Sequence, residues 1–167
     1  CKSKKKKGLL IFVALVVIVA AVIAGMNYSA VQTLIRQGNS YDKVEYENQL
    51  TPEKDKNGNW YFTTDKDFKV MHLTDIHIGG GFMSKGVDQK ALNAVATMVT
   101  KEKPDLVVLT GDQIQGYSAC YLKDTEAKVQ HVINEFIAPI AERNIPFCVT
   151  FGNHDDDCKC SKEVQMK

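Results

Sequence analysis

The sequence has few of the residues that mark the more unusual classes of protein. Only 4 of its 167 residues are proline and 11 are glycine, which excludes collagen-like and low-complexity chains. Its 5 cysteines are too few and too irregularly spaced for a disulfide scaffold. Hydrophobic residues make up 44% and charged residues 25%, which is the composition of an ordinary globular protein. A chain of this length usually forms one domain, with or without an appendage.

The sequence also lacks a strong net charge, but its total of +1 hides an uneven distribution. Five lysines lie among the first seven residues, and the remaining 16 basic residues are outnumbered by 20 acidic ones. The chain is therefore a basic tip followed by an acidic body with a balance of −4. Because the body has no basic, aromatic-rich face, we expect no nucleic acid partner.

No charged residue occurs between Gly8 and Arg36, and residues 9–24 are apolar throughout. A run of this length is sufficient to cross a bilayer core of roughly 30 Å as a helix. We predict a cytoplasmic basic tip at 1–8 and a transmembrane anchor at 9–26, with everything after it extracytoplasmic. This makes the chain a single-pass protein of the cell membrane, in contact with lipid through that helix. The alternative is a cleaved signal peptide, which would make the body secreted, but the apolar run is long for one.

Residues 27–58 are mostly polar and carry several turn signals, so they are predicted to form a linker to a domain at 59–167. At the start of that domain, residues 60–64 and 68–74 are rich in β-forming side chains. They predict a hairpin whose second arm is the first strand of a sheet.

From Phe68 onward, apolar strands alternate with helical patterns. Strands are predicted at 68–74, 105–110 and 147–151, and helices with apolar stripes at 88–103 and 127–143. This order is typical of an α/β fold with a parallel sheet covered by helices. Within the strands, His72 and Cys148 are expected to be packed rather than exposed.

Each of the three strands ends in polar residues: Asp75 and His77 after the first, Asp112 after the second, and Asn153, His154 and Asp155 after the third. Ligands of parallel α/β sheets bind beyond the carboxyl ends of the strands, so these side chains are expected to converge. Carboxylate, amide and imidazole groups together make a ligand set for divalent metal ions.

The order D-x-H, G-D and G-N-H-D, each after a strand, resembles the calcineurin-like metallophosphoesterase superfamily over residues 68–157. The resemblance implies the parallel β-α-β-α-β half of a metallophosphoesterase sandwich, here preceded by one transmembrane helix. It also implies phosphate-ester substrates and a dinuclear centre of two divalent or trivalent ions, Mn, Fe or Zn. Such a pair of ions activates a shared water and clamps phosphoryl oxygens during in-line displacement.

The resemblance assigns a role to each residue at the strand ends. Asp75 and His77 match ligands of the first metal, Asp112 the carboxylate that bridges both metals, and Asn153 a ligand of the second. His154 matches the catalytic histidine that assists the leaving group without binding metal. Asp155 matches an acidic residue that does not bind metal itself but orients the residues that do.

Two departures from the family pattern qualify this reading. Gln115 stands where the family often has Asp, or Tyr in purple acid phosphatases, and no histidine follows His154. The family's C-terminal histidine ligands are therefore missing, and we expect a truncated N-terminal half that is inactive alone. Two alternatives stay open: a decayed, non-catalytic anchored binding module, and a nuclease of the same superfamily.

Overall fold

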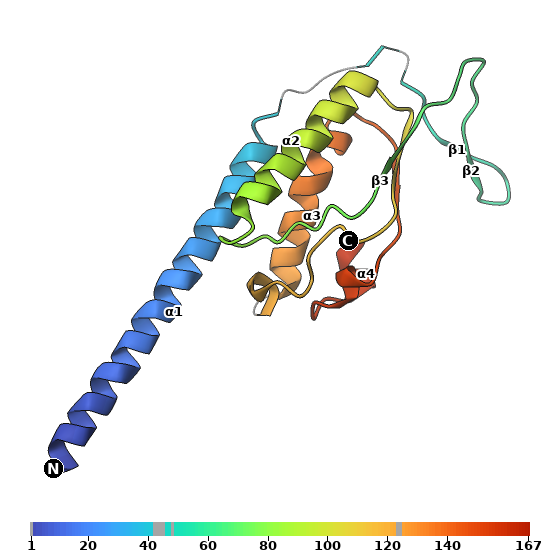
Figure 1. Ribbon diagram of the computed structural model, residues 1–167. Coiled ribbons are helices and arrows are strands. Elements are labelled where there is room, and N and C mark those ends of the chain that lie inside the picture. The colour runs from blue at the N-terminus through green and yellow to red at the C-terminus, as the bar shows by residue number, and fades with distance from the viewer. Residues whose placement is uncertain (1, 42–45, 48, 123–124) are drawn as a thin grey trace.

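The computed structural model describes residues 2–41, 46–47, 49–122 and 125–167. It is an α/β structure with a long N-terminal helix, α1 (Lys2–Gly38), that extends well beyond the rest of the molecule (Figure 1). The part of the predicted linker at 42–45 and 48 lies outside the described residues, as does Cys1.

The main sheet has three parallel strands in the order β3 (Val70–Leu73), β4 (Leu106–Leu109) and β5 (Phe147–Val149). The register places Leu73 opposite Leu109, and Leu109 opposite Val149, so that the three strands end at the same level. The prediction of a parallel β-α-β-α-β arrangement is therefore confirmed.

Two helices connect these strands and cover one face of the sheet. Helix α2 (Lys85–Glu102) is capped by Lys103, whose left-handed backbone (φ 48°) stops the helix directly before Pro104. Helix α3 (Thr125–Ala141) buries Val129, Val132, Phe136 and Ile140 at helical spacing, as its apolar stripe predicts. Short helices complete the chain: η1 (Ala119–Leu122), η2 (His154–Asp156) and α4 (Lys162–Gln165).

The first part of the predicted linker is helical. Helix α1 continues without interruption to Gly38, and its last turns pack against α2 and α3 (Figure 1). Ala30, Val31 and Leu34 share one side of the helix and are at most 9% exposed, and Leu34 belongs to the main core. These three apolar residues lie at positions i, i+1 and i+4 between polar residues and therefore share one helix face. Burial of that face against the domain stabilises the helical conformation relative to an unfolded linker.

The predicted hairpin has a different pair of arms. Strands β1 (Glu53–Lys54) and β2 (Trp60–Tyr61) pair antiparallel around a turn at Gly58 (φ 86°), and the Asp55 carboxylate accepts backbone hydrogen bonds inside it. The prediction that 60–64 pairs with 68–74 is wrong. The second segment pairs with β4 instead, because parallel pairing places Leu73 in the core.

The sheet has two unlike faces. Helices α1, α2 and α3 lie on one side of it in Figure 1, where Val107 and Leu109 are almost fully buried. On the other face Val70 is 49% exposed, and His72 and Cys148 are exposed as well. The expectation that His72 and Cys148 are packed is therefore wrong for the described chain, since no described helix covers their face. His72 forms a ring-nitrogen hydrogen bond with the Thr110 hydroxyl instead.

Candidate metal centre

The candidate site begins where the three parallel strands stop. Backbone hydrogen bonds continue the ladder past the regular strands, from Asp75 N to Gly111 O (3.1 Å) and from His77 N to Asp112 O (2.9 Å). Ile78 and Ile114 then form an isolated parallel bridge, and both side chains are 1% exposed. The loops that carry the polar residues are therefore held in register by main-chain bonds and anchored by buried isoleucines.

The backbone of the site is unusual at three positions. Asp75 (φ 56°), His77 (φ 51°) and Asp112 (φ 53°) all adopt the left-handed conformation. Aspartate and histidine are among the side chains that tolerate this region, but it is still uncommon outside glycine. Residues held in such conformations concentrate at functional sites, where the surrounding structure determines them. Three of the four residues that the sequence assigns to metal binding are held in this way.

Asp75, His77 and Asp112 bring one donor atom each to within 4.8 Å of one another. His77 Nε2 lies 3.6 Å from Asp75 Oδ1 and 3.8 Å from Asp112 Oδ2. These distances are too long for hydrogen bonds. They match the separation of about 3.4 Å expected between two ligands bound at about 2.1 Å in a tetrahedral site. The donor set and its spacing therefore fit a divalent metal ion placed between the three side chains.

The other ring nitrogen of His77, Nδ1, is buried and has no hydrogen-bond partner among the described residues. Buried polar atoms without a partner are rare and are found where function or a bound group constrains a side chain. The ring is held by its backbone and neighbours, not by a hydrogen bond of its own.

Asp155 lies beneath the site and connects two of the loops. It is 1% exposed, and Oδ2 accepts hydrogen bonds from Asp112 N and Gly152 N, both at 2.8 Å. Oδ1 accepts a third from Ile114 N at 3.1 Å. A carboxylate that accepts three backbone hydrogen bonds fixes the chain segments that supply them. Asp155 thus holds the Asp112 loop against the loop that follows β5.

Two glycines allow these loops to meet. A Cβ atom on Gly111 (φ 116°) would lie 2.6 Å from Gly152 N, and one on Gly152 would overlap the Asp112 carboxylate. The main chains after β4 and β5 are thus in direct contact at this point. Only glycine at both positions allows that approach.

His154 stands at the rim of the site. Its backbone N–H donates to Asp112 Oδ1 (2.9 Å), and its ring lies 5.3 Å from the His77 ring. Its Nδ1 lies 2.6 Å from Asp157 Oδ2, and this hydrogen bond raises the pKa of His154 above its ordinary value. The structure therefore places His154 beside the metal donors, with one ring nitrogen already engaged.

Two of the residues selected from the sequence are less involved in this cluster. Asn153 is exposed and makes no side-chain capping bond to η2, although it directly precedes His154. Gln115, which replaces the family's Asp or Tyr, donates through Nε2 to the Tyr117 hydroxyl at 2.7 Å. The role of Asn153 as a ligand of the second metal thus stays a prediction. The Gln115 side chain is already engaged in a hydrogen bond with Tyr117.

Two neighbours of His154 were missed from the sequence. Neither Asp157, whose carboxylate bonds His154 Nδ1, nor Tyr117, whose ring packs edge-on at 4.9 Å from the His154 ring, is among the residues selected from the sequence. Asp157 follows His154 by three residues in a short helical turn, a spacing that brings side chains together. That signal was available, whereas nothing in the sequence indicates the contact with Tyr117.

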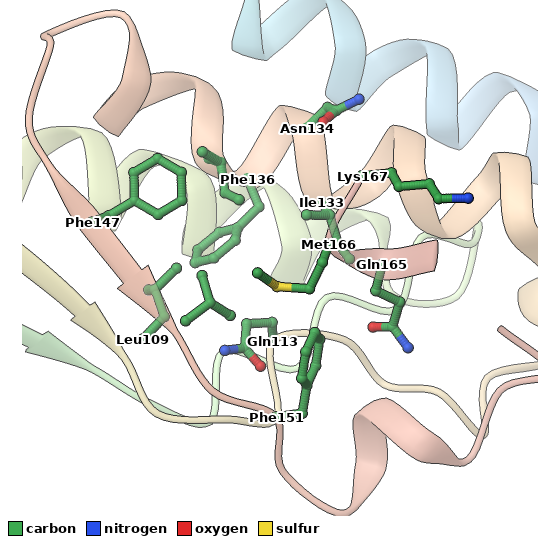
Figure 2. Close-up of a pocket in the computed structure, with 12 residues that line it drawn as sticks. Leu109, Gln113, Ile133, Asn134, Phe136, Phe147, Phe151, Gln165, Met166 and Lys167 are labelled. Atoms are coloured by element: carbon green, nitrogen blue, oxygen red, sulfur yellow. The ribbon is translucent and has the colours of Figure 1, made fainter. Parts of the chain in front are cut away.

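A pocket of about 200 Å³ lies apart from these donors (Figure 2). It opens between α3, β5 and the last residues of the chain, and Figure 2 shows Phe136, Phe147 and Met166 directed into it. None of Asp75, His77 and Asp112 lines it. Its mainly apolar wall offers no ionised carboxylate or imidazole for phosphate-ester chemistry.

The site thus has the donor set of a metal centre built on a parallel α/β sheet. Residues 68–166 match the family described as Calcineurin-like phosphoesterase, and the chain belongs to that family. No solved structure matches the chain.

Comparison with curated proteins gives relatives in the same superfamily. Over 106 residues the chain is 35% identical to Phosphatase DCR2 of Saccharomyces cerevisiae, covering 57% of this chain and 17% of that protein. It is 31% identical over 117 residues to Probable inactive purple acid phosphatase 14 of Arabidopsis thaliana, covering 64% and 28%. Probable inactive purple acid phosphatase 29 of the same plant is 30% identical over 116 residues. The chain spans less than a third of the length of each of these relatives.

Proposed function

We propose that this chain is part of a membrane-anchored, metal-dependent phosphoesterase that hydrolyses phosphate esters. The observation that carries the proposal is the convergence of Asp75, His77 and Asp112 at the ends of two parallel strands, with donor atoms within 4.8 Å. Membership of a phosphoesterase family and similarity to a named phosphatase support the same reaction class.

In this proposal the polar residues divide the work between metal binding and substrate handling. Asp75 and His77 would hold the first ion, Asp112 would serve both ions, and Asn153 would contribute to the second. When bound, Mn, Fe or Zn ions would supply Lewis-acid activation of the phosphate ester and of water.

His154 and Asp155 act without binding metal. Because Nδ1 of His154 is engaged by Asp157, Nε2 is the nitrogen that holds or releases a proton at a phosphate oxygen. Asp155 keeps Asp112 in place through the backbone bonds it accepts.

Helix α1 supports the anchoring part of the proposal. It is long and apolar enough to cross a membrane, judged by its length and composition. Its lysine-rich beginning supports a cytoplasmic N-terminus, with the metal centre on the opposite side of the membrane.

A second candidate function is a non-catalytic anchored module that keeps the fold and has lost turnover. Three of the relatives are named as probable inactive purple acid phosphatases, which favours this candidate. It differs from the first in one measurable property, because a decayed site need not hydrolyse a phosphate ester even when it binds metal.

The test compares the complete chain in detergent micelles with Asp112→Asn and with a control, Asp67→Asn. Asp67 is exposed and lies outside the site, so its variant should retain metal. We expect the wild type to bind Mn²⁺, and Asp112→Asn to bind it at least about 100-fold more weakly, since loss of even an outer partner costs 10–100-fold. Because this chain is expected to be inactive alone, hydrolysis of p-nitrophenyl phosphate separates the two candidates only in a protein that also includes the C-terminal histidines of the family. In that protein, metal binding without hydrolysis supports the module. Absence of metal binding overturns the metal centre.

A further inference from the structure

Helix α1 changes its surroundings abruptly near Asn27. Between Leu9 and Ile23 its large apolar side chains are 42–75% exposed, whereas Ala30 and Leu34 are 1% exposed. At the change, Asn27 Oδ1 accepts a hydrogen bond from Phe82 N at 3.0 Å. The 18 residues before Asn27 span about 27 Å as a helix, close to the thickness of a bilayer core. The folded domain therefore begins where the apolar segment ends, with no flexible spacer between them.

The hydrogen bonds of α1 also fix its direction relative to α2. Asn27 meets Phe82 just before α2, and ten residues later Gln37 Nε2 donates to Gln89 O (2.8 Å) and to Asn93 Oδ1 (2.9 Å). The two helices thus run side by side in the same direction, as Figure 1 shows. The beginning of α2, not its end, lies nearest to the exposed apolar part of α1.

This direction determines which edge of the sheet faces the apolar segment. In a β-α-β unit, a helix begins on the side where the preceding strand ends. Only residues 78–81 separate His77 from Phe82, and Cys120 Sγ donates to Gly80 O beside them. The strand ends that carry the metal donors therefore point toward the same side as the exposed part of α1.

Exposed apolar side chains surround this side of the domain. Met83, the residue after Phe82, is 86% exposed, and Leu122 is 75% exposed. Leu122, Lys128 and His131 line a cleft of about 600 Å³ whose other wall is α1, at Ala20 and Ile23. The opposite end of the domain, where the strands begin, presents the exposed charges of Lys101 and Glu102 beside less exposed apolar side chains such as Phe68 (36%) and Phe147 (39%). An exposed apolar rim beside an apolar helix is the arrangement expected of a surface that rests on lipid.

We propose that the domain lies with its metal-donor edge toward the bilayer, touching it through Met83 and Leu122, and that its substrate is the phosphate ester of a membrane lipid. This rests on the anchored phosphoesterase proposed above and names its substrate class. Water replaces the lipid alcohol on phosphorus: one P–O bond to the alcohol breaks, one P–O bond to water oxygen forms, and the alcohol leaves with a proton. A lipid in the same bilayer is held near the site at a high effective concentration, whereas a soluble ester is not.

The orientation is tested with the complete chain in phosphatidylcholine vesicles. Single cysteines labelled with a polarity-sensitive fluorophore replace Met83, Leu122, Val16 or Lys101, in a background where Cys1 and the exposed Cys148 are serine. Lipids with a quencher in the acyl chain report contact. We expect quenching at 16, 83 and 122 and none at 101.

Quenching at 16 combined with none at 83 and 122 would overturn the orientation while leaving the anchor intact. An unquenched label at 16 would instead show that α1 does not enter the bilayer. That result would overturn the membrane anchor of the proposed function, on which the orientation depends. The two failures are thus read from different labels.

The substrate class is tested by ³¹P relaxation with one equivalent of Mn²⁺. Phosphatidic acid in the vesicles is compared with soluble glycerol 3-phosphate at the same bulk concentration, and Asp112→Asn measures the relaxation that does not arise from the site. We expect site-dependent relaxation of phosphatidic acid to exceed that of glycerol 3-phosphate at least about 10-fold. Equal relaxation of the two esters would overturn the lipid substrate alone. No difference between wild type and Asp112→Asn would count against the metal centre itself.

Discussion

The helix-covered interior of the sheet and the edge where its strands end are built on opposite principles. In the interior, the backbone is regular and side chains such as Val99, Val107 and Ile140 are fully buried. At the edge, three non-glycine residues have left-handed backbones, and two carboxylates stand close together. The interior therefore supplies the stability of the domain, and the edge uses part of it to hold reactive groups in place. Substitutions in the two regions should therefore change the free energy of unfolding by different amounts, and in one case with the opposite sign.

The largest effect is expected for Phe136→Ala in the interior. Phe136 is 1% exposed and belongs to the main core, so truncation should lower the free energy of unfolding by about 3–5 kcal/mol. Urea unfolding in detergent micelles measures the change, with the exposed neighbour Asn134→Ala as control at within about 0.5 kcal/mol of wild type. A small effect at Phe136 would show that the interior does not dominate stability.

The next effect is expected for Asp155→Ala, below the edge. The substitution leaves the backbone N–H groups of Asp112, Ile114 and Gly152 without their acceptor, which should cost about 2–4 kcal/mol. Asp155→Asn retains one acceptor oxygen and should fall between wild type and Asp155→Ala. If the two variants were equally stable, the charge and geometry of this carboxylate would not support the site.

A pH-dependent effect is expected for Asp88, which lies between the two regions. Asp88 is 1% exposed and accepts hydrogen bonds from Gly79 N, Gly80 N and the Ser84 hydroxyl. Burial raises the pKa of Asp88 and outweighs these bonds, which lower it. The folded chain therefore binds this proton more tightly than the unfolded chain does.

The contribution of Asp88 should thus be most favourable below its unfolded pKa of about 3.9, and should decline as pH rises through the folded pKa. Asp88→Asn has no such proton. The free energy of unfolding of wild type minus that of the variant should fall over this window in urea titrations between pH 3 and 7. A difference that stays constant with pH would contradict the prediction.

The smallest effect, of opposite sign, is expected for Asp75→Gly in metal-free buffer. Glycine relieves the left-handed backbone and removes one of two neighbouring carboxylates, which should stabilise the fold by about 0.5 kcal/mol. The same variant should lose Mn²⁺ binding, as measured by electron paramagnetic resonance. A loss of stability at this position would mean that the edge contributes to the fold as the interior does.

The sequence predicted the parts of the molecule that depend on local pattern. The apolar strands, the stripe through Val129 and Phe136, and the order of elements are each confirmed, because period and composition are local properties. The convergence of Asp75, His77 and Asp112 followed from the general behaviour of parallel sheets and is present in the structure.

Features that depend on contacts between distant segments could not be obtained in this way. The packing of Leu34 against the domain, and the contact of Tyr117 with His154, require knowledge of which surfaces meet. The exposure of His72 and Cys148 depends on which face of the sheet is covered, and a run of apolar residues does not report that.

The contact between Gly111 and Gly152 has a consequence for how this site can change over generations. A side chain on Gly111 would collide with the main chain of Gly152, and a side chain on Gly152 would collide with Asp112. No single substitution at either position therefore preserves the geometry of Asp112. A lineage that has stopped needing the metal centre is released from this constraint and can fill the space in one step. A chain that still carries both glycines has therefore kept the part of the site that a single substitution can destroy. Restoring the site after a glycine-to-alanine change would require the two loops to return to direct contact.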